Sequence, residues 1–121
     1  MCSLDTVFRA LSDERRRIAV SCLGAHESLT LPDVAEFVTE RERAKPLSSI
    51  DATVVRDVYL SLYHTHVPIL EEAGVVRYEQ ERDLVVRTDQ YRPMLRRAGA
   101  EIAELRAVQH LDLDLDLEPN D

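Results

Sequence analysis

Apolar residues at the start of the chain recur at the spacing of an amphipathic helix. Four of them occupy positions i, i+3, i+4 and i+7, namely Leu4, Val7, Phe8 and Leu11. Ser12 and Asp13 can cap a following turn, and the apolar face then continues to a stop at Gly24. A further helix is predicted from about Thr30 to Arg43, with Pro32 in its first turn. The first third of the chain is therefore predicted to be helical.

A later apolar stripe predicts another helix, which follows a loop over residues 45–49 and has Asp51 as its N-cap. Its inward residues are Val54, Val55, Val58, Tyr59 and Leu62. Pro68 removes a backbone donor and disfavours helix at Val67, so we predict a break or kink near residues 64–66. Residues 65–73 are then either a separate short helix or the bent end of this one.

The pattern changes from helical to strand-like after Gly74, a residue that can end a helix in the left-handed conformation. Residues 75–79 and 84–87 are rich in β-type side chains, and the polar residues 80–83 form a turn between them. A β-hairpin directly after a helix is predicted. The fold class is therefore mainly α with a small antiparallel β-hairpin.

A last helix is predicted over residues 90–109, capped by Asp89. Its apolar residues are spaced 4-3-4-3, namely Tyr91, Leu95, Ala98, Ile102 and Leu105. Such a seam can pack on its own domain or pair with its twin in a second copy. Strict heptad spacing favours pairing, so these residues are the predicted interface of a homodimer.

The end of the chain alternates Leu and Asp over residues 111–117. We expect the acidic segment 110–121 to be disordered, because dense like charges resist compaction. The alternative is an edge strand added to a partner. At 121 residues the chain is large enough for one core, so a single domain over residues 1–109 is expected.

The net charge of −8 is unusual for a small nucleic-acid-binding domain, which is more often basic. Five acidic residues lie in the last ten, and 14 of the 15 basic residues are arginine, with Lys45 the lone lysine. An acidic, lysine-poor chain resembles the proteomes of salt-in halophilic archaea, where high internal salt screens surface charge. The acidity therefore indicates habitat before function.

Other chemistry finds little support in the sequence. No apolar run approaches the length of a membrane span and no secretory leader is present, so a cytoplasmic protein without a membrane partner is expected. Cys2 and Cys22 are too few for a disulfide framework, and Cys22 is predicted to be a buried thiol. The sequence contains no catalytic motif, and its three glycines are too few for a glycine-rich phosphate-binding loop. Neither an enzyme nor a cofactor is expected.

Three segments carry a resemblance to a known family, namely Phe8–Ile18, Leu31–Val38 and His66–Val76. They and the order of the elements resemble the ArsR-like winged-helix transcriptional regulators, and more closely the small winged-helix domains of halophilic archaea. The chain departs from the metal-sensing members because it has no Cys-x-Cys pair. The resemblance implies a winged helix-turn-helix with an additional C-terminal dimerisation helix, and double-stranded DNA as the partner.

A winged helix places one helix in the major groove and its hairpin, the wing, against the adjacent backbone. Arginine suits both contacts. The positions that the resemblance implies, with the basic cluster before the third helix, are Arg41, Arg43, Lys45, Arg56, Ser61, His64, Thr65, Arg77, Arg82 and Arg87, of which Arg82 at the wing tip is favoured. The alternative is that the arginines are solvated and paired with neighbouring carboxylates, among them Glu40, Glu42, Asp57, Glu79 and Glu81.

Two further groups are assigned ordinary roles. Arg15, Arg16 and Arg17 fan around a helix, so a solvated surface is favoured over phosphate contact. His64 and His66, spaced i, i+2, are unsuited to joint metal ligation, and the resemblance implies a packing or hydrogen-bonding role for His66. DNA-binding transcriptional regulation is the predicted function. The alternative is a winged-helix protein-interaction module that no longer binds DNA.

Overall fold

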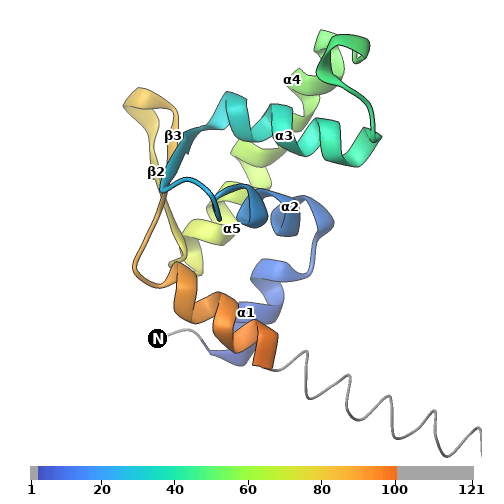
Figure 1. Cartoon of the computed structure of the whole chain (residues 1–121). Helices are drawn as coiled ribbons and strands as arrows, with labels where there is room; N and C mark the ends of the chain where they lie inside the picture. The colour runs from blue at the N-terminus through green and yellow to red at the C-terminus, as the bar shows by residue number, and fades with distance from the viewer. Residues whose placement is uncertain (1–2, 101–121) are drawn as a thin grey trace, which may run out of the picture.

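A computed structural model describes residues 3–100 of the chain. Its helices are α1 (Leu4–Leu11), α2 (Glu14–Cys22), α3 (Leu31–Arg43), α4 (Ala52–Ser61) and α5 (Val67–Glu72), and residues 91–100 are also helical. Its strands are β1 (Ser28–Thr30), β2 (Val76–Glu79) and β3 (Leu84–Arg87). Short 3-10 turns occupy Leu47–Ser49 and Gln80–Arg82, and a π turn occupies Leu62–His66. Figure 1 shows α3 lying across α4, with the β2–β3 hairpin at one end of α3 and the helix of residues 91–100 at the other side of the molecule, near α1.

Side-chain caps explain where the early helices begin. The side chains of Asp13 and Thr30 accept hydrogen bonds from backbone N–H groups in the first turns of α2 and α3. The predicted helix start near Thr30 and the predicted capping at Asp13 are confirmed, and the turn that Asp13 caps begins a separate helix, α2. Asp51 stands at the predicted N-cap of α4, but its side chain makes no capping hydrogen bond. At the last helix the capping acceptor is the Thr88 hydroxyl, 3.2 Å from the Gln90 nitrogen, rather than the predicted Asp89.

The predicted disturbance before Pro68 is a π turn, not a break. The Val67 N–H donates to the Leu62 carbonyl five residues back, and the backbone on both sides keeps helical dihedral angles. A wider turn accommodates a proline, which has no N–H of its own and whose ring crowds the preceding turn. Residues 65–73 are therefore the continuation of the α4 helix into α5.

The sheet has one more strand than the predicted hairpin. Its order is β1-β3-β2 with antiparallel pairing throughout, and Val85 of β3 pairs with Leu29 on one side and Tyr78 on the other. The hairpin prediction is confirmed. β1 was not predicted, because three residues are too short to show a strand period and depend on pairing with β3.

The core forms where the helices α1 to α5, the sheet and the last helix meet. Its largest fully buried residues include Leu23, Leu31, Leu62, Leu70 and Met94. Tyr91 and Ala98 also belong to this core, with exposed fractions of 2% and 5%, and the Tyr91 hydroxyl donates to the Val20 carbonyl at 2.6 Å.

The burial of Tyr91 and Ala98 corrects the predicted dimer seam. These two residues pack inside their own domain, because the stripe of residues 91–98 faces the core that the other helices leave uncovered. Leu95 is 37% exposed and so remains available at the surface. Ile102 and Leu105, and the acidic segment 110–121, lie outside the described residues.

Arg16 also differs from expectation, because it is only 6% exposed. Its guanidinium donates to the Ala10 carbonyl at 2.9 Å and to the Arg9 carbonyl at 3.0 Å, both at the end of α1. Carbonyls at a helix C-terminus lack partners within the helix and carry partial negative charge. A buried arginine therefore caps α1, a role that the run of three arginines does not reveal.

Candidate nucleic-acid interface

The outward face of α4 carries a mixed set of side chains. Residues spaced three or four apart along it and its continuation are exposed, namely Thr53, Arg56, Asp57, Leu60 and His64. Thr65 is exposed beside them, and Ser61 is only half-buried. Arg56 and His64 are the hydrogen-bond donors of this face that suit base edges or phosphates.

The hairpin carries two arginines that share one carboxylate. Arg77 donates to Glu79 at 2.6 Å, and Arg82 in the turn pairs with the other oxygen of the same carboxylate. The hydrogen bond from Arg77, together with that from Arg82, holds the pKa of Glu79 below its ordinary value. The arginine side chains are 58% and 71% exposed. The alternative prediction, pairing with acidic neighbours, is thus confirmed for the hairpin.

A cluster of three tyrosines joins α4 and the π turn to the hairpin. Tyr63 stacks on Tyr59 with ring centroids 6.3 Å apart, and it meets Tyr78 of β2 edge-on at 5.8 Å. The Tyr59 and Tyr78 hydroxyls both donate to Asp83, the residue after the hairpin turn. Gln80 in the turn also donates to the Tyr63 hydroxyl at 3.4 Å. Aromatic packing and hydrogen bonds thus hold the hairpin against the α4 helix.

Arg87 does not lie with the other predicted DNA-contacting residues. Its guanidinium donates to the Leu23 carbonyl at 3.2 Å and lies over the Tyr91 ring, 5.2 Å from the centroid. This residue closes β3 at the end away from the hairpin turn, which directs it to the last helix. A packing role replaces the predicted phosphate contact.

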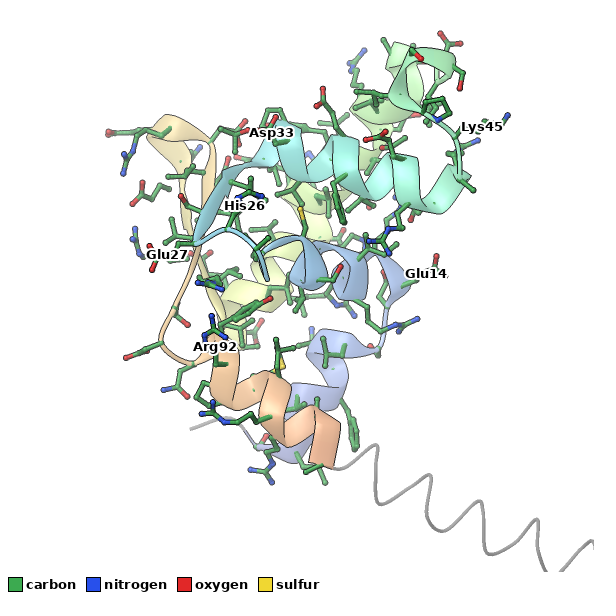
Figure 2. The ribbon with its side chains drawn as sticks, viewed as in Figure 1. Glu14, His26, Glu27, Asp33, Lys45 and Arg92 are labelled. Carbon is green, nitrogen blue, oxygen red and sulfur yellow. The ribbon has the colours of Figure 1, made fainter. Side chains whose placement is uncertain are left out.

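The basic cluster before α4 is exposed at the far end of α3. Arg41 lies over the Phe37 ring at 5.1 Å, and Arg43 ends the helix. Figure 2 shows Lys45 at the opposite end of the molecule from the hairpin turn, in the segment that leads into α4. The ten predicted residues therefore do not form one compact patch. The tyrosines and Asp83 join the α4 helix to the hairpin turn, whereas Arg41, Arg43 and Lys45 lie at the far end of α3 and in the segment before α4.

His66 is buried beneath this surface and confirms the predicted hydrogen-bonding role. Its Nδ1 lies 3.0 Å from Nη1 of Arg16, and it accepts this hydrogen bond when the ring is neutral. Asp13 lies 3.9 Å from the same nitrogen. Burial is the main cause that lowers the pKa of His66. The positive charges of Arg16 and Arg15 lower it further, and the negative charges of Asp13 and Glu42 oppose the shift. No sequence pattern indicates that Arg16 and His66 are partners, because 50 residues separate them.

Protonation of His66 is expected to destabilise the protein in acid. Its folded pKa lies below the unfolded value of 6.5, so the stabilisation is complete above pH 6.5 and is lost as pH falls toward the folded pKa. In His66→Gln, which keeps an acceptor without titrating, urea unfolding should show a shallower loss of stability below pH 6.5 than the wild type. His64→Gln, an exposed neighbour, is the matched control. Coincident pH profiles for wild type and His66→Gln would contradict the assignment.

The described residues carry little that suits metal binding, thiol chemistry or a membrane span. Between residues 3 and 100, no group of three or more His, Cys, Asp or Glu side chains is arranged to hold a metal ion. Cys22 is buried, as predicted, and burial raises the pKa of its thiol to about 11, which disfavours the reactive thiolate. No helix within that span has the length and apolar character to cross a membrane.

Comparison with known proteins yields one family. A model described as a domain of unknown function (DUF7344) matches residues 8–86, a span that includes α2 to β2 and most of β3. The chain belongs to this family. No curated protein and no solved structure matches this chain.

Proposed function

We propose that this member of the DUF7344 family is a DNA-binding transcriptional regulator of a halophilic archaeon, acting in the cytoplasm without enzymatic activity. The observation that carries the proposal is the junction of α4, α5 and the hairpin. A long helix runs directly into β2 and β3, and the three tyrosines hold the hairpin beside that helix. Two projecting elements with exposed arginines suit a groove and its neighbouring backbone.

The topology supports a winged helix-turn-helix. β1 lies between α2 and α3 in the chain and pairs with β3, so the hairpin extends a sheet anchored in the body. This order of helix, strand, helix, helix and hairpin supports a winged-helix arrangement. In it α4 is the recognition helix and the turn over residues 80–83 is the wing tip.

Homodimerisation through the C-terminal helix is also part of the proposal, now with a reduced set of residues. Leu95 is exposed on that helix, and Phe8 of α1 is 41% exposed. Operator binding by a dimer places two recognition helices about one DNA turn apart. The other predicted seam residues, Ile102 and Leu105, lie outside the described residues.

A protein-interaction module is the second candidate, and the carboxylate of Glu79 favours it. Arg77 and Arg82 already have an anionic partner, so phosphate must displace Glu79 before it gains their charge. Asp57 stands next to Arg56 on the exposed face of α4, and Glu81 lies in the hairpin turn. Such a surface repels a duplex unless salt screens it.

Fluorescence anisotropy against genomic DNA fragments, from moderate to molar salt, tests the proposal. The wild type should bind, and affinity should fall as salt rises because phosphate contacts release counterions. Arg56→Ala and Arg82→Ala should each weaken DNA binding about tenfold. If the replaced arginine contacts a phosphate, the slope of log affinity against log salt concentration should also fall by about one. Arg92→Ala is the control, since Figure 2 places this residue away from both Lys45 and the hairpin turn.

Glu79→Gln separates the two candidates in the same titration. It removes the charge that competes with phosphate, so a DNA-binding wing should bind more tightly than the wild type. No binding by either protein at any salt concentration would exclude the regulator and leave the interaction module.

A further inference from the structure

Asp83 stands at the point where the hairpin turn enters β3. Its backbone is left-handed, with φ of 50°, and its N–H donates to the Gln80 carbonyl at 3.2 Å. Aspartate and asparagine tolerate this conformation better than most residues, and glycine adopts it freely. The turn alone therefore does not require a carboxylate at this position.

The carboxylate of Asp83 receives a different tyrosine on each oxygen. The Tyr59 hydroxyl of α4 donates to Oδ2 at 2.6 Å, and the Tyr78 hydroxyl of β2 donates to Oδ1 at 2.5 Å. Its backbone carbonyl accepts from the Leu31 N–H at 2.7 Å, at the start of α3. One residue thus connects α3, α4 and both hairpin strands.

The location makes this acidic residue unexpected on a surface for DNA. A carboxylate beside the arginines of a phosphate-binding hairpin repels the ligand, and hydrogen bonds to a charged group are among the stronger ones in proteins. Two phenol donors that converge from separate elements satisfy both oxygens, so the charge serves the junction between helix and hairpin.

We propose that Asp83 is a positioning residue that fixes the hairpin at a set distance and angle from α4, so that both elements meet one duplex. The inference rests on the proposed function for its ligand, and on the geometry of Asp83, Tyr59 and Tyr78 for its mechanism. A hairpin released from α4 keeps its arginines but no longer holds them in register with the recognition helix. Affinity then falls through lost wing contacts while the fold persists.

Three variants test the role of the carboxylate. Asp83→Asn keeps the shape and the tolerance of a left-handed backbone, and it replaces one acceptor oxygen by a donor. Tyr59→Phe removes a single donor and covers the case in which the first variant folds poorly. Tyr63→Phe is the matched control, because its hydroxyl receives only the 3.4 Å contact from Gln80 in the cluster and leaves the partners of Asp83 intact.

The readouts separate positioning from stability. For protein that circular dichroism shows to be folded, Asp83→Asn should lower DNA affinity about tenfold. It should also reduce the slope of log affinity against log salt concentration by up to about two, one each for Arg77 and Arg82. Tyr59→Phe should act in the same direction, and Tyr63→Phe should leave both quantities unchanged. A folded Asp83→Asn with wild-type affinity and slope would overturn the proposal.

A second readout needs no DNA. The hydrogen bond to Asp83 raises the pKa of Tyr59 to about 12, and desolvation with the bond to Asp83 also raises that of Tyr78. In Asp83→Asn the ultraviolet signal of tyrosinate should appear at lower pH, nearer the ordinary value of 10. Amide exchange across β2 and β3 should accelerate as the hairpin detaches.

These measurements keep the two proposals apart. If the wild type binds no DNA, the proposed function fails, and the positioning role is then judged by tyrosine titration and amide exchange. Faster amide exchange in the hairpin of Asp83→Asn, together with tyrosine titration at lower pH, would support Asp83 as the residue that positions the hairpin. Unchanged exchange and titration would overturn it whatever the wild type binds.

Discussion

Arg16→Met is expected to lower the free energy of unfolding by about 3 kcal/mol, since each buried polar group left without a partner costs about 1–3 kcal/mol. Methionine retains the apolar stem but none of the donors. The Ala10 carbonyl and Nδ1 of His66 then lose the partners that Arg16 supplies, at 2.9 Å and 3.0 Å. The Arg9 carbonyl is affected less, because the Ser12 hydroxyl also donates to it at 2.9 Å.

Urea unfolding of Arg16→Met beside Arg17→Met measures this effect. Arg17 is the next residue on α2, is exposed, and donates to the Leu11 carbonyl at 2.8 Å. Its replacement should cost less than about 1 kcal/mol, because water can satisfy an exposed carbonyl. Equal losses in the two variants would contradict the assignment of Arg16 as the buried cap of α1.

Leu62→Ala is expected to destabilise the protein by about 3 kcal/mol, within the range for leucine-to-alanine changes that leave a cavity. Leu62 is fully buried at the first position of the π turn, and its carbonyl accepts the i−5 hydrogen bond from Val67. Helical backbone continues on both sides of Leu62, so the surrounding residues can move little into the space that the truncation leaves, and the cavity should persist.

Leu60→Ala is the matched control, two residues earlier on the same helix. Leu60 is 37% exposed on the outward face of α4, so its truncation should cost about 1 kcal/mol or less. Thermal or urea unfolding of both variants checks the difference. A loss in Leu60→Ala as large as in Leu62→Ala would mean that the outward face of α4 is covered by another molecule.

The DNA-binding proposal and these stability predictions meet in the same helix. The inward side of the segment from α4 to α5 carries Leu62 and His66, which join the core and the buried arginine. The outward side carries Arg56 and His64. The π turn lies between the two helices, so it orients both sides at once. A change inside the domain can therefore alter the outer surface.

The elements whose signals are local can be predicted from the amino-acid sequence. Helices α1, α2 and α3 begin at side chains that cap their own first turns, and their apolar residues repeat within one helix. The hairpin follows Gly74, whose φ of 82° suits glycine, and its strands are rich in β-type residues. Periodicity, caps and turns act over a few residues, so they can be read without a tertiary structure.

The partners that meet across long sequence separations are known only from the folded chain. β1 exists because β3 pairs with it, Arg16 is buried because the end of α1 and His66 converge on it, and Asp83 is held by Tyr59, 24 residues away. A heptad seam has the same spacing whether it faces its own core or a second copy, and Tyr91 proved to face the core. These outcomes depend on long-range packing, in which the free energy of burial is set by surfaces that only the folded chain brings together.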